Sequence, residues 1–194
     1  MNSKSILTIK NMVCPRCIKV VREELEVLGL TVESITLGSA TVMEQIDQNL
    51  KTKISKMMLD NGFELLENEK AKLIEKVKIE IIDVIQNFET IELEYFNISD
   101  HLSKILETEY STISSLFSKT AGITIEHFFI LQKIEKVKEL LRYDQLTLSE
   151  IAYNLGYSSV QHLSTQFRKN TGMTASHFKK NSDNLRNPID SIGE

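Results

Sequence analysis

Both cysteines of the chain lie in one short segment near the N-terminus, and their spacing is that of a two-thiolate site. Cys14 and Cys17 begin and end the segment Cys-Pro-Arg-Cys. Where a loop enters a helix, cysteines at this spacing can turn both sulfurs toward one point, and the helix N-terminus and Arg16 favour thiolate. Two soft ligands without a third suit Cu(I), whereas structural zinc needs four. We therefore expect Cys14 and Cys17 to bind Cu(I), which the fold itself does not require.

Two other interpretations of this cysteine pair stay open. The same spacing suits a thiol–disulfide redox pair, which would make the chain a thiol oxidoreductase. The loop could equally be purely structural. The enzyme interpretation is the weakest because no acid–base pair, glycine-rich nucleotide loop or second cysteine pair accompanies the motif. We therefore do not expect an enzyme.

Basic residues gather near the other end of the sequence. The whole chain of 194 residues carries a net charge of −4, which by itself argues against nucleic acid. Residues 158–180, however, contain Arg168, Lys169, Lys179 and Lys180 and no acidic residue. Local charge decides whether a surface can face phosphates, so this segment remains compatible with DNA binding.

The same half of the chain contains an internal repeat. SLFSKTAGITIEHF and TQFRKNTGMTASHF align without a gap 50 residues apart. Each copy reads as a helix with a basic last turn, then a glycine, then the start of another helix. Residues 98–180 are expected to be helical throughout, with helices over 99–106, 111–120, 124–143, 150–155, 158–170 and 175–179. This pattern predicts two helix-turn-helix units joined by a connecting helix.

The stretch LSEIAYNLGYSSVQHLSTQFRKNTGMTASHFKK strongly resembles the signature of the AraC family of transcription regulators, and the likeness extends over about residues 73–180. The resemblance implies two recognition helices entering successive major-groove segments of double-stranded DNA, about 34 Å apart. It also implies which side chains face DNA. In the first helix these are Ser111, Ser114, Ser115 and Ser118, and in the second Val160, Gln161, Ser164 and Thr165, with Ser158, Ser159, Arg168 and Lys169 suited to phosphates.

Gln161 is the best candidate for reading a base, because its amide can bond adenine in the major groove. The first recognition helix departs from the usual pattern, since it is rich in serine and threonine and offers no arginine to guanine. Its role is therefore expected to be weaker, directed to phosphates, or spread over water bridges.

The N-terminal third alternates between strand and helix signals. Strands are expected over 5–10, 31–37, 40–46 and 63–66, and helices over 18–28 and 48–60. The order β-α-β-β-α-β within about 66 residues is the ferredoxin-like arrangement. The segments MVCPRC, VESITLGSATV and NGFEL resemble the heavy-metal-associated domain of copper chaperones and copper-pumping ATPases over residues 4–66. This resemblance implies a copper-donating protein as a partner. Asn11 and Pro15 depart from the family pattern, and Pro15 stiffens the loop.

The segment 71–88 has apolar residues at intervals of three and four, namely Ile74, Val77, Ile81, Val84 and Phe88. Such a seam either forms the first core helix of the next domain or pairs with a second protomer in a homodimer. We divide the chain into a metal-binding domain (1–68), a connecting helix and linker (69–97), a DNA-binding domain (98–181) and a disordered tail (182–194). The fold class is α+β, with the ferredoxin-like domain preceding an all-α domain with two helix-turn-helix motifs.

No apolar run approaches the roughly 18 residues that span a bilayer, and the first residues do not read as a secretory signal. We expect a cytoplasmic protein without a membrane partner. The sequence thus predicts a sequence-specific, DNA-binding transcription regulator that responds to Cu(I). The alternative is the same regulator with an N-terminal domain that mediates dimerisation or protein contacts without metal.

Overall fold

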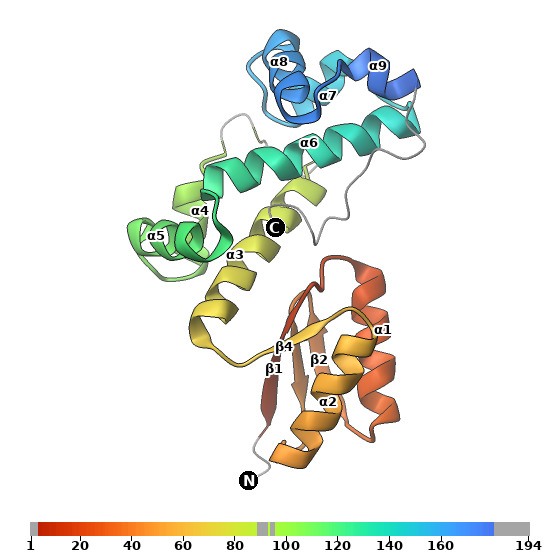
Figure 1. Cartoon of the computed structure of the whole chain (residues 1–194), viewed down its shortest axis with the longest axis vertical. Helices are drawn as coiled ribbons and strands as arrows, with labels where there is room; N and C mark the ends of the chain where they lie inside the picture. The colour runs from red at the N-terminus through yellow and green to blue at the C-terminus, as the bar shows by residue number, and fades with distance from the viewer. Residues whose placement is uncertain (1–3, 89–92, 94–95, 181–194) are drawn as a thin grey trace. The chain divides into compact units, whose positions relative to one another are not determined.

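The computed structural model describes residues 4–88, 93 and 96–180. The chain forms two compact units, residues 1–79 and 80–194, and each is described by itself (Figure 1). The division falls between Ile79 and Glu80, later than the boundary expected after residue 68. The predicted disordered tail and most of the linker between 89 and 95 lie outside the described residues.

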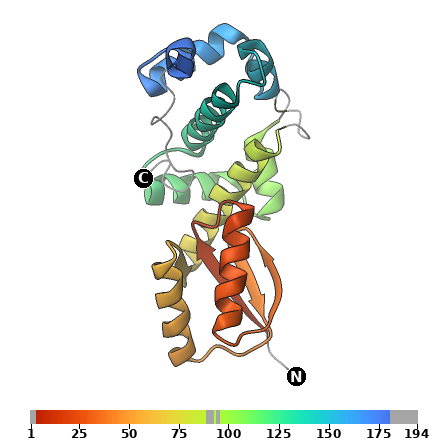
Figure 2. The ribbon, with the colours of Figure 1, turned by 90° about the vertical axis from the view of Figure 1, so that its right-hand side faces the viewer.

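The first unit contains four strands and two helices before the chain leaves the sheet. These are β1 (Ser5–Lys10), α1 (Pro15–Val27), β2 (Val32–Thr36), β3 (Ser39–Val42), α2 (Gln48–Asp60) and β4 (Glu64–Leu66). The sheet has the order β2-β3-β1-β4 with antiparallel neighbours. Helices α1 and α2 cover one of its faces (Figure 2). The expected order of strands and helices is thus present.

The core of this unit follows from the alternation along β1. Leu7 and Ile9 are buried, whereas Ile6 is 71% exposed on the opposite face of the sheet. The inward residues meet Val21 and Leu25 of α1 and Ile54 and Met58 of α2 in one apolar cluster. Asp47 caps α2, because its carboxylate accepts the Leu50 N–H at 2.7 Å.

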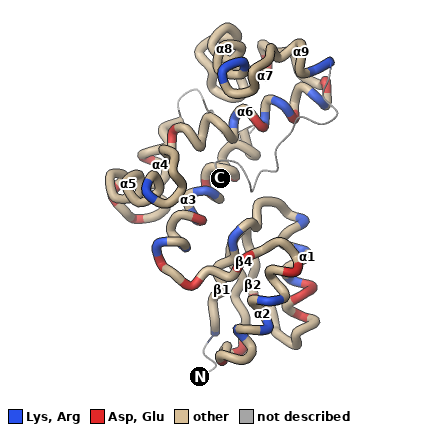
Figure 3. The backbone as a smooth tube through the Cα atoms, in the orientation of Figure 1, with Lys and Arg blue, Asp and Glu red and all other residues tan. Residues whose placement is uncertain are grey.

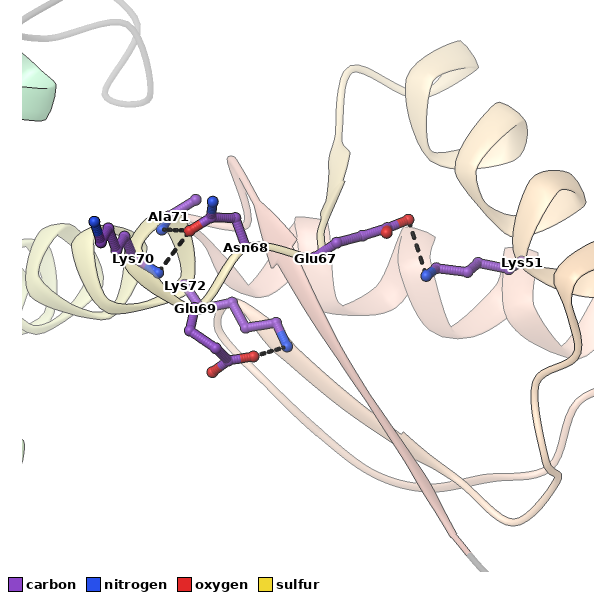
Figure 4. A network of polar contacts seen from close by, with 7 residues as sticks. All are labelled: Lys51, Glu67, Asn68, Glu69, Lys70, Ala71 and Lys72. Atoms are coloured by element: carbon purple, nitrogen blue, oxygen red, sulfur yellow. Dashed lines mark hydrogen bonds and ion pairs between the residues drawn. The ribbon is translucent and has the colours of Figure 1, made fainter.

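Helix α3 (Glu69–Gln86) begins after β4 and runs through the point where the two units divide. Asn68 caps its N-terminus by accepting the N–H groups of Lys70 and Ala71, and Lys51 pairs with Glu67 at 3.0 Å (Figure 4). The predicted apolar seam is buried, from Ile74 at 5% exposed to Val77 and Ile81 at 0%. The side chains of the seam are therefore covered within the single chain, and pairing with a second protomer stays a prediction.

The described residues of the second unit form six further helices. They are α4 (Ile98–Ile105), α5 (Tyr110–Ala121), α6 (Ile125–Tyr143), α7 (Leu148–Asn154), α8 (Val160–Thr171) and α9 (Ala175–Lys180). The pairs α4–α5 and α7–α8 lie toward opposite ends of the long helix α6 (Figure 1). Among the residues described, no helix combines the length and apolar character that a membrane span requires.

The internal repeat is visible in the packing. Phe117 meets Phe128 edge to face with ring centroids 5.7 Å apart, and Phe167 meets Phe178 at the same separation. Gly122 and Gly172 end α5 and α8 in the left-handed region, with φ values of 73° and 76°. Both copies of the repeat therefore fold alike, because their apolar and turn residues match.

Candidate nucleic-acid interface and cysteine site

Helix α8 carries most of the predicted DNA-facing side chains of the second repeat unit. Ser159 caps it by accepting the His162 N–H at 3.0 Å. The preceding helix α7 begins with a capping box between Thr147 and Glu150. These caps fix where each helix begins, and they leave Gln161, Thr165 and other outward side chains of α8 exposed.

An open groove of about 730 Å³ lies along α8. Its lining includes five predicted residues, namely Gln161, Ser164, Thr165, Arg168 and Lys169. Ser158, Ser159 and Val160 lie at the start of the helix and do not line this groove. The structure thus gathers the predicted base reader and the two basic residues among the four predicted phosphate contacts on one hollowed surface.

Four further residues complete the lining and were not predicted from the sequence: Leu148, Thr174, Ala175 and Ser176. Thr174 has a recognisable signal, because it precedes a short helix as a capping residue and accepts the His177 N–H at 3.2 Å. The other three depend on how α7 and α9 pack beside α8, which periodicity does not reveal.

The groove is electropositive at the C-terminal end of α8. Arg168 and Lys169 occupy the last turn of this helix, and both are exposed. Lys180 follows on α9, whereas Lys179 forms an ion pair with Asp144. Figure 3 shows these basic positions along α8 and α9, a segment that contains no acidic residue. Cations at this place can bind phosphate oxygens and displace counterions from DNA.

A buried lysine supports α8 from within the unit. Lys133 of α6 is 8% exposed, and its Nζ lies 4.0 Å from the ring centroid of Tyr157, just before α8. Burial lowers the pKa of Lys133 to about 8. The Tyr157 hydroxyl is buried without a hydrogen-bond partner, and burial raises its pKa. The turn before α8 therefore rests on a cation–π contact in a dry environment.

The first repeat unit presents a different surface. Helix α5 carries all four predicted serines, with Ser111 and Ser115 exposed and Ser114 and Ser118 half-buried. The repeat aligns Ser118 with Arg168, so Lys119 is the basic residue of the last turn. The first repeat unit therefore lacks the arginine that the second repeat unit has at the matched position.

An acidic residue replaces a small one at another matched position. Glu126 aligns with Ser176, which lines the groove beside α8. The Tyr110 hydroxyl donates a hydrogen bond to the Glu126 carboxylate, and this bond lowers the pKa of Glu126. Burial is the main cause that raises the pKa of Tyr110, and the hydrogen bond to Glu126 raises it further. An ionised carboxylate thus lies beside the first recognition helix.

The two cysteines meet at the N-terminus of α1. Cys14 is the N-cap residue and Pro15 is the first residue of the helix. Proline fits this position because an N–H group there would have no partner within the helix. The two Sγ atoms are 3.2 Å apart, and Cys17 also donates weakly to the Asn11 carbonyl at 3.9 Å. Both side chains are half-buried, which leaves the pair accessible from solvent.

The two thiols differ in acidity. Burial alone would raise the pKa of Cys14, but hydrogen bonds from Cys17 and the charge of Arg16 outweigh it, so its pKa lies below its ordinary value. Burial and the bond to Cys14 raise the pKa of Cys17. Cys14 is therefore the more acidic of the two thiols, and its thiolate is the more readily available ligand for a soft cation.

The ligand set at this site is small. Across the described part of the chain, no three His, Cys, Asp or Glu residues gather into a metal-binding group. Met12 is fully buried in the core cluster of this unit and is not exposed at the site. The donors that remain are two sulfurs, which fit Cu(I) and leave a zinc ion two ligands short.

The C-terminal half of the chain is similar to known proteins. Residues 102–181 match a family model described as a helix-turn-helix domain. The xylose operon regulatory protein of Haemophilus influenzae is 32% identical over 76 residues, which are 39% of this chain and 20% of that protein. The probable transcriptional regulator LumQ of Photobacterium leiognathi is 24% identical over 151 residues, 77% of this chain and 59% of that one. The chain therefore spans about a fifth of the length of the first relative and about three-fifths of the length of the second.

Two solved structures are similar to part of this chain. The C-terminal domain of the two-component response regulator yesN from Fusobacterium nucleatum is 29% identical, with a TM-score of 0.42 over 50% of this chain and 95% of that one. The C-terminal domain of AraT, a response regulator from Geobacillus stearothermophilus, is 19% identical, with a TM-score of 0.47 over 59% and 88%.

Residues 102–181 are thus similar to a helix-turn-helix domain, in agreement with the two helix-turn-helix units that the internal repeat predicts.

Proposed function

We propose that the chain is a sequence-specific transcription regulator that binds double-stranded DNA chiefly through α8. The observation that carries this proposal is the groove in which Gln161, Arg168 and Lys169 lie together. Gln161 supplies the amide that can bond adenine, and the two cations supply phosphate contacts. Helix α5 provides a second, weaker contact with the next segment of the major groove.

Binding of the full-length chain to a selected duplex tests this function. Arg168→Ala should weaken binding to all sequences alike, because a phosphate contact carries no sequence information. Gln161→Ala should instead relax preference at one base step by ~1–3 kcal/mol. Arg142→Ala and Gln145→Ala are matched controls at exposed positions outside the groove. A folded wild-type chain that prefers no duplex in a selection experiment would overturn the proposal.

We also propose that the N-terminal unit is a heavy-metal-associated domain of ferredoxin-like fold whose cysteines bind one Cu(I). The 3.2 Å separation of the two sulfurs, the lowered pKa of Cys14 and the strand order β2-β3-β1-β4 support this assignment. Cys14 and Cys17 would hold the ion, and a copper-donating protein would supply it. Bound metal would then make the regulator responsive to copper.

Titration with Cu(I) against a competing chelator tests the metal site. One equivalent should bind per chain, Ag(I) should substitute for it, and Zn(II) should bind much more weakly. Cys14→Ser and Cys17→Ser should each abolish tight binding while leaving circular dichroism unchanged, since serine is close to cysteine in size and neither side chain is fully buried. Tight binding that survives the double substitution would contradict the assignment.

One observation favours a second candidate role for the N-terminal unit. Ile6, Val27 and Leu59 are 71%, 81% and 63% exposed. Such residues can mediate protein contacts or dimerisation without any metal. Sedimentation of the wild-type chain, compared with Ile6→Thr, separates this role from metal binding, because the substitution should change assembly and leave Cu(I) stoichiometry intact.

A further inference from the structure

Helix α3 contacts the cysteine loop through one buried carboxylate. Glu75 is 4% exposed, and its Oε1 accepts the backbone N–H of Asn11 at 2.9 Å. The Asn11 carbonyl of the same residue is the acceptor for the Cys17 thiol. Asn11 thus connects Glu75, which lies about two turns from the start of α3, with Cys17, one of the two candidate metal ligands.

The conformation of Asn11 is fixed from several sides. Its φ is 70°, in the left-handed region that few residues other than glycine and asparagine adopt readily. Its side-chain amide donates to the Gly62 carbonyl at 3.2 Å, where α2 has ended. A backbone held in this region depends on its surroundings, so a change at Cys17 or Glu75 should be felt by the whole loop.

The first part of α3 is itself fixed to the sheet unit. Its N-terminus is capped by Asn68, and the preceding Glu67 is paired with Lys51 (Figure 4). One turn beyond Glu75, the Ile79 side chain occupies the space beside Gly38 so closely that a Cβ there would lie 2.1 Å from Ile79 Cδ1. This part of α3 therefore has little freedom to move independently of the loops at that end of the sheet.

The second part of α3 is fixed equally well within the DNA-binding unit. Glu80 pairs with His101 of α4 at 3.3 Å, and Gln86 accepts from Lys136 of α6 at 2.8 Å. Val84 belongs to the same apolar cluster as Leu163 and Phe167 of α8. Helix α3 is continuous from Glu69 to Gln86, so one helix makes contacts within the first unit near its start and within the second unit near its end.

We propose that Glu75 is a positioning residue that couples the occupancy of the Cys14–Cys17 site to α3 and thereby to DNA affinity. The proposal rests on the proposed function of both units. When Cu(I) binds, the Cys17 sulfur exchanges its proton for the metal, the proton leaves to solvent, and the thiol no longer donates to Asn11. Asn11 then readjusts, and the bond from its N–H to Glu75 passes the change to the helix.

The test compares operator affinity of the full chain with and without Cu(I), at fixed salt and under reducing conditions. For the wild type, Cu(I) should change affinity by a factor of about 5–150, the usual range for coupled sites. Glu75→Leu removes the acceptor at similar size, and it should reduce the factor to below about 2 while Cu(I) stoichiometry and apo DNA affinity stay near wild type. Glu75→Gln keeps an acceptor oxygen and should retain most of the response.

Glu69→Leu is the matched control, because it makes the same substitution on the same helix at an exposed position. A measurement on the wild type keeps the proposal testable should Glu75→Leu fail to fold. Hydrogen exchange of the Asn11 amide and of α3 amides should change when Ag(I) or Cu(I) is added. Unchanged exchange in a metal-loaded chain would overturn the coupling role.

The outcomes separate this inference from the function beneath it. A wild-type chain that binds no Cu(I), or no specific DNA, overturns the proposed function and the coupling with it. A wild-type chain that responds to Cu(I) while Glu75→Leu responds equally overturns the coupling role of Glu75 alone. A response that is lost in Glu75→Leu and kept in Glu69→Leu supports it.

Discussion

Placing an arginine at Ser118 should give the first recognition helix the phosphate contact that it lacks. Ser118 aligns with Arg168, and both lie near the C-terminal end of their helices, α5 and α8. The two repeat units share the same kind of aromatic pair and the same terminal glycine, so their backbones present this position alike. Ser118→Arg should therefore extend a cation toward DNA as Arg168 does.

The size of the effect follows from counterion release. Each phosphate neutralised by a cation changes the slope of log affinity against log salt by about 0.9. Raising salt fourfold, from about 50 to 200 mM, should then weaken Ser118→Arg by about 3.5-fold more than wild type. Arg168→Ala should be weakened by about 3.5-fold less over the same range, and the double variant should return to the wild-type slope.

Fluorescence anisotropy with one duplex at several salt concentrations measures all four slopes. Val27→Arg is the control, because it adds the same charge to an 81% exposed position of the N-terminal unit. That control should leave the slope unchanged. A Ser118→Arg slope equal to that of wild type, with a reduced slope for Arg168→Ala, would show that α5 does not approach phosphates and would refute the two-helix binding mode.

Three further outcomes are expected. Glu126→Ser should raise DNA affinity in the same anisotropy assay, because it removes a carboxylate that would face phosphates; lower affinity would mean that the carboxylate bonds a base. Lys133 has a pKa lowered by burial from 10.5 to about 8, so the unfolded state binds more protons between these values and stability rises with pH across that window. Lys133→Met should therefore raise the free energy of urea unfolding at pH 7 by up to ~3 kcal/mol, less the cation–π contact with Tyr157, and the gain should vanish above pH 10.5. Thr147→Ala removes the cap of α7 and should cost ~1 kcal/mol in the same unfolding measurement, whereas an unchanged midpoint would show that the capping box with Glu150 is dispensable.

Local signals predicted the order of most elements, and the errors concern where helices and strands end. The strand expected over 40–46, for example, is β3 and ends at Val42. Helices α2 and α4 begin where the side chains of Asp47 and Asn97 accept backbone N–H groups. Helix α1 starts at Pro15 rather than at Ile18, because proline fits the first turn of a helix as well as it stiffens a loop. Helix α8 starts at Val160 rather than Ser158, since Ser159 acts as its cap.

Long-range polar contacts could not be predicted, because periodicity has no term for them. Glu75 and Asn11 are 64 residues apart in sequence, and α3 appears polar at position 75 like any solvated helix face. Lys133 of α6 likewise has the residue type of a surface position, yet its side chain is buried against Tyr157. The candidate cysteine site and α8 surface were accessible to sequence reasoning because each is contained in one short segment.

The repeat shows that the fold of each unit does not depend on the side chains that would face DNA. Both copies keep a threonine cap, at Thr124 and Thr174, and each accepts the N–H of the histidine three residues later. The matched outward positions instead differ in charge, as Ser118 and Arg168 do. Because two such different surfaces fold on one framework, substitutions at these positions should alter binding without altering stability. Differences in DNA affinity between these variants can therefore be attributed to the contacts themselves.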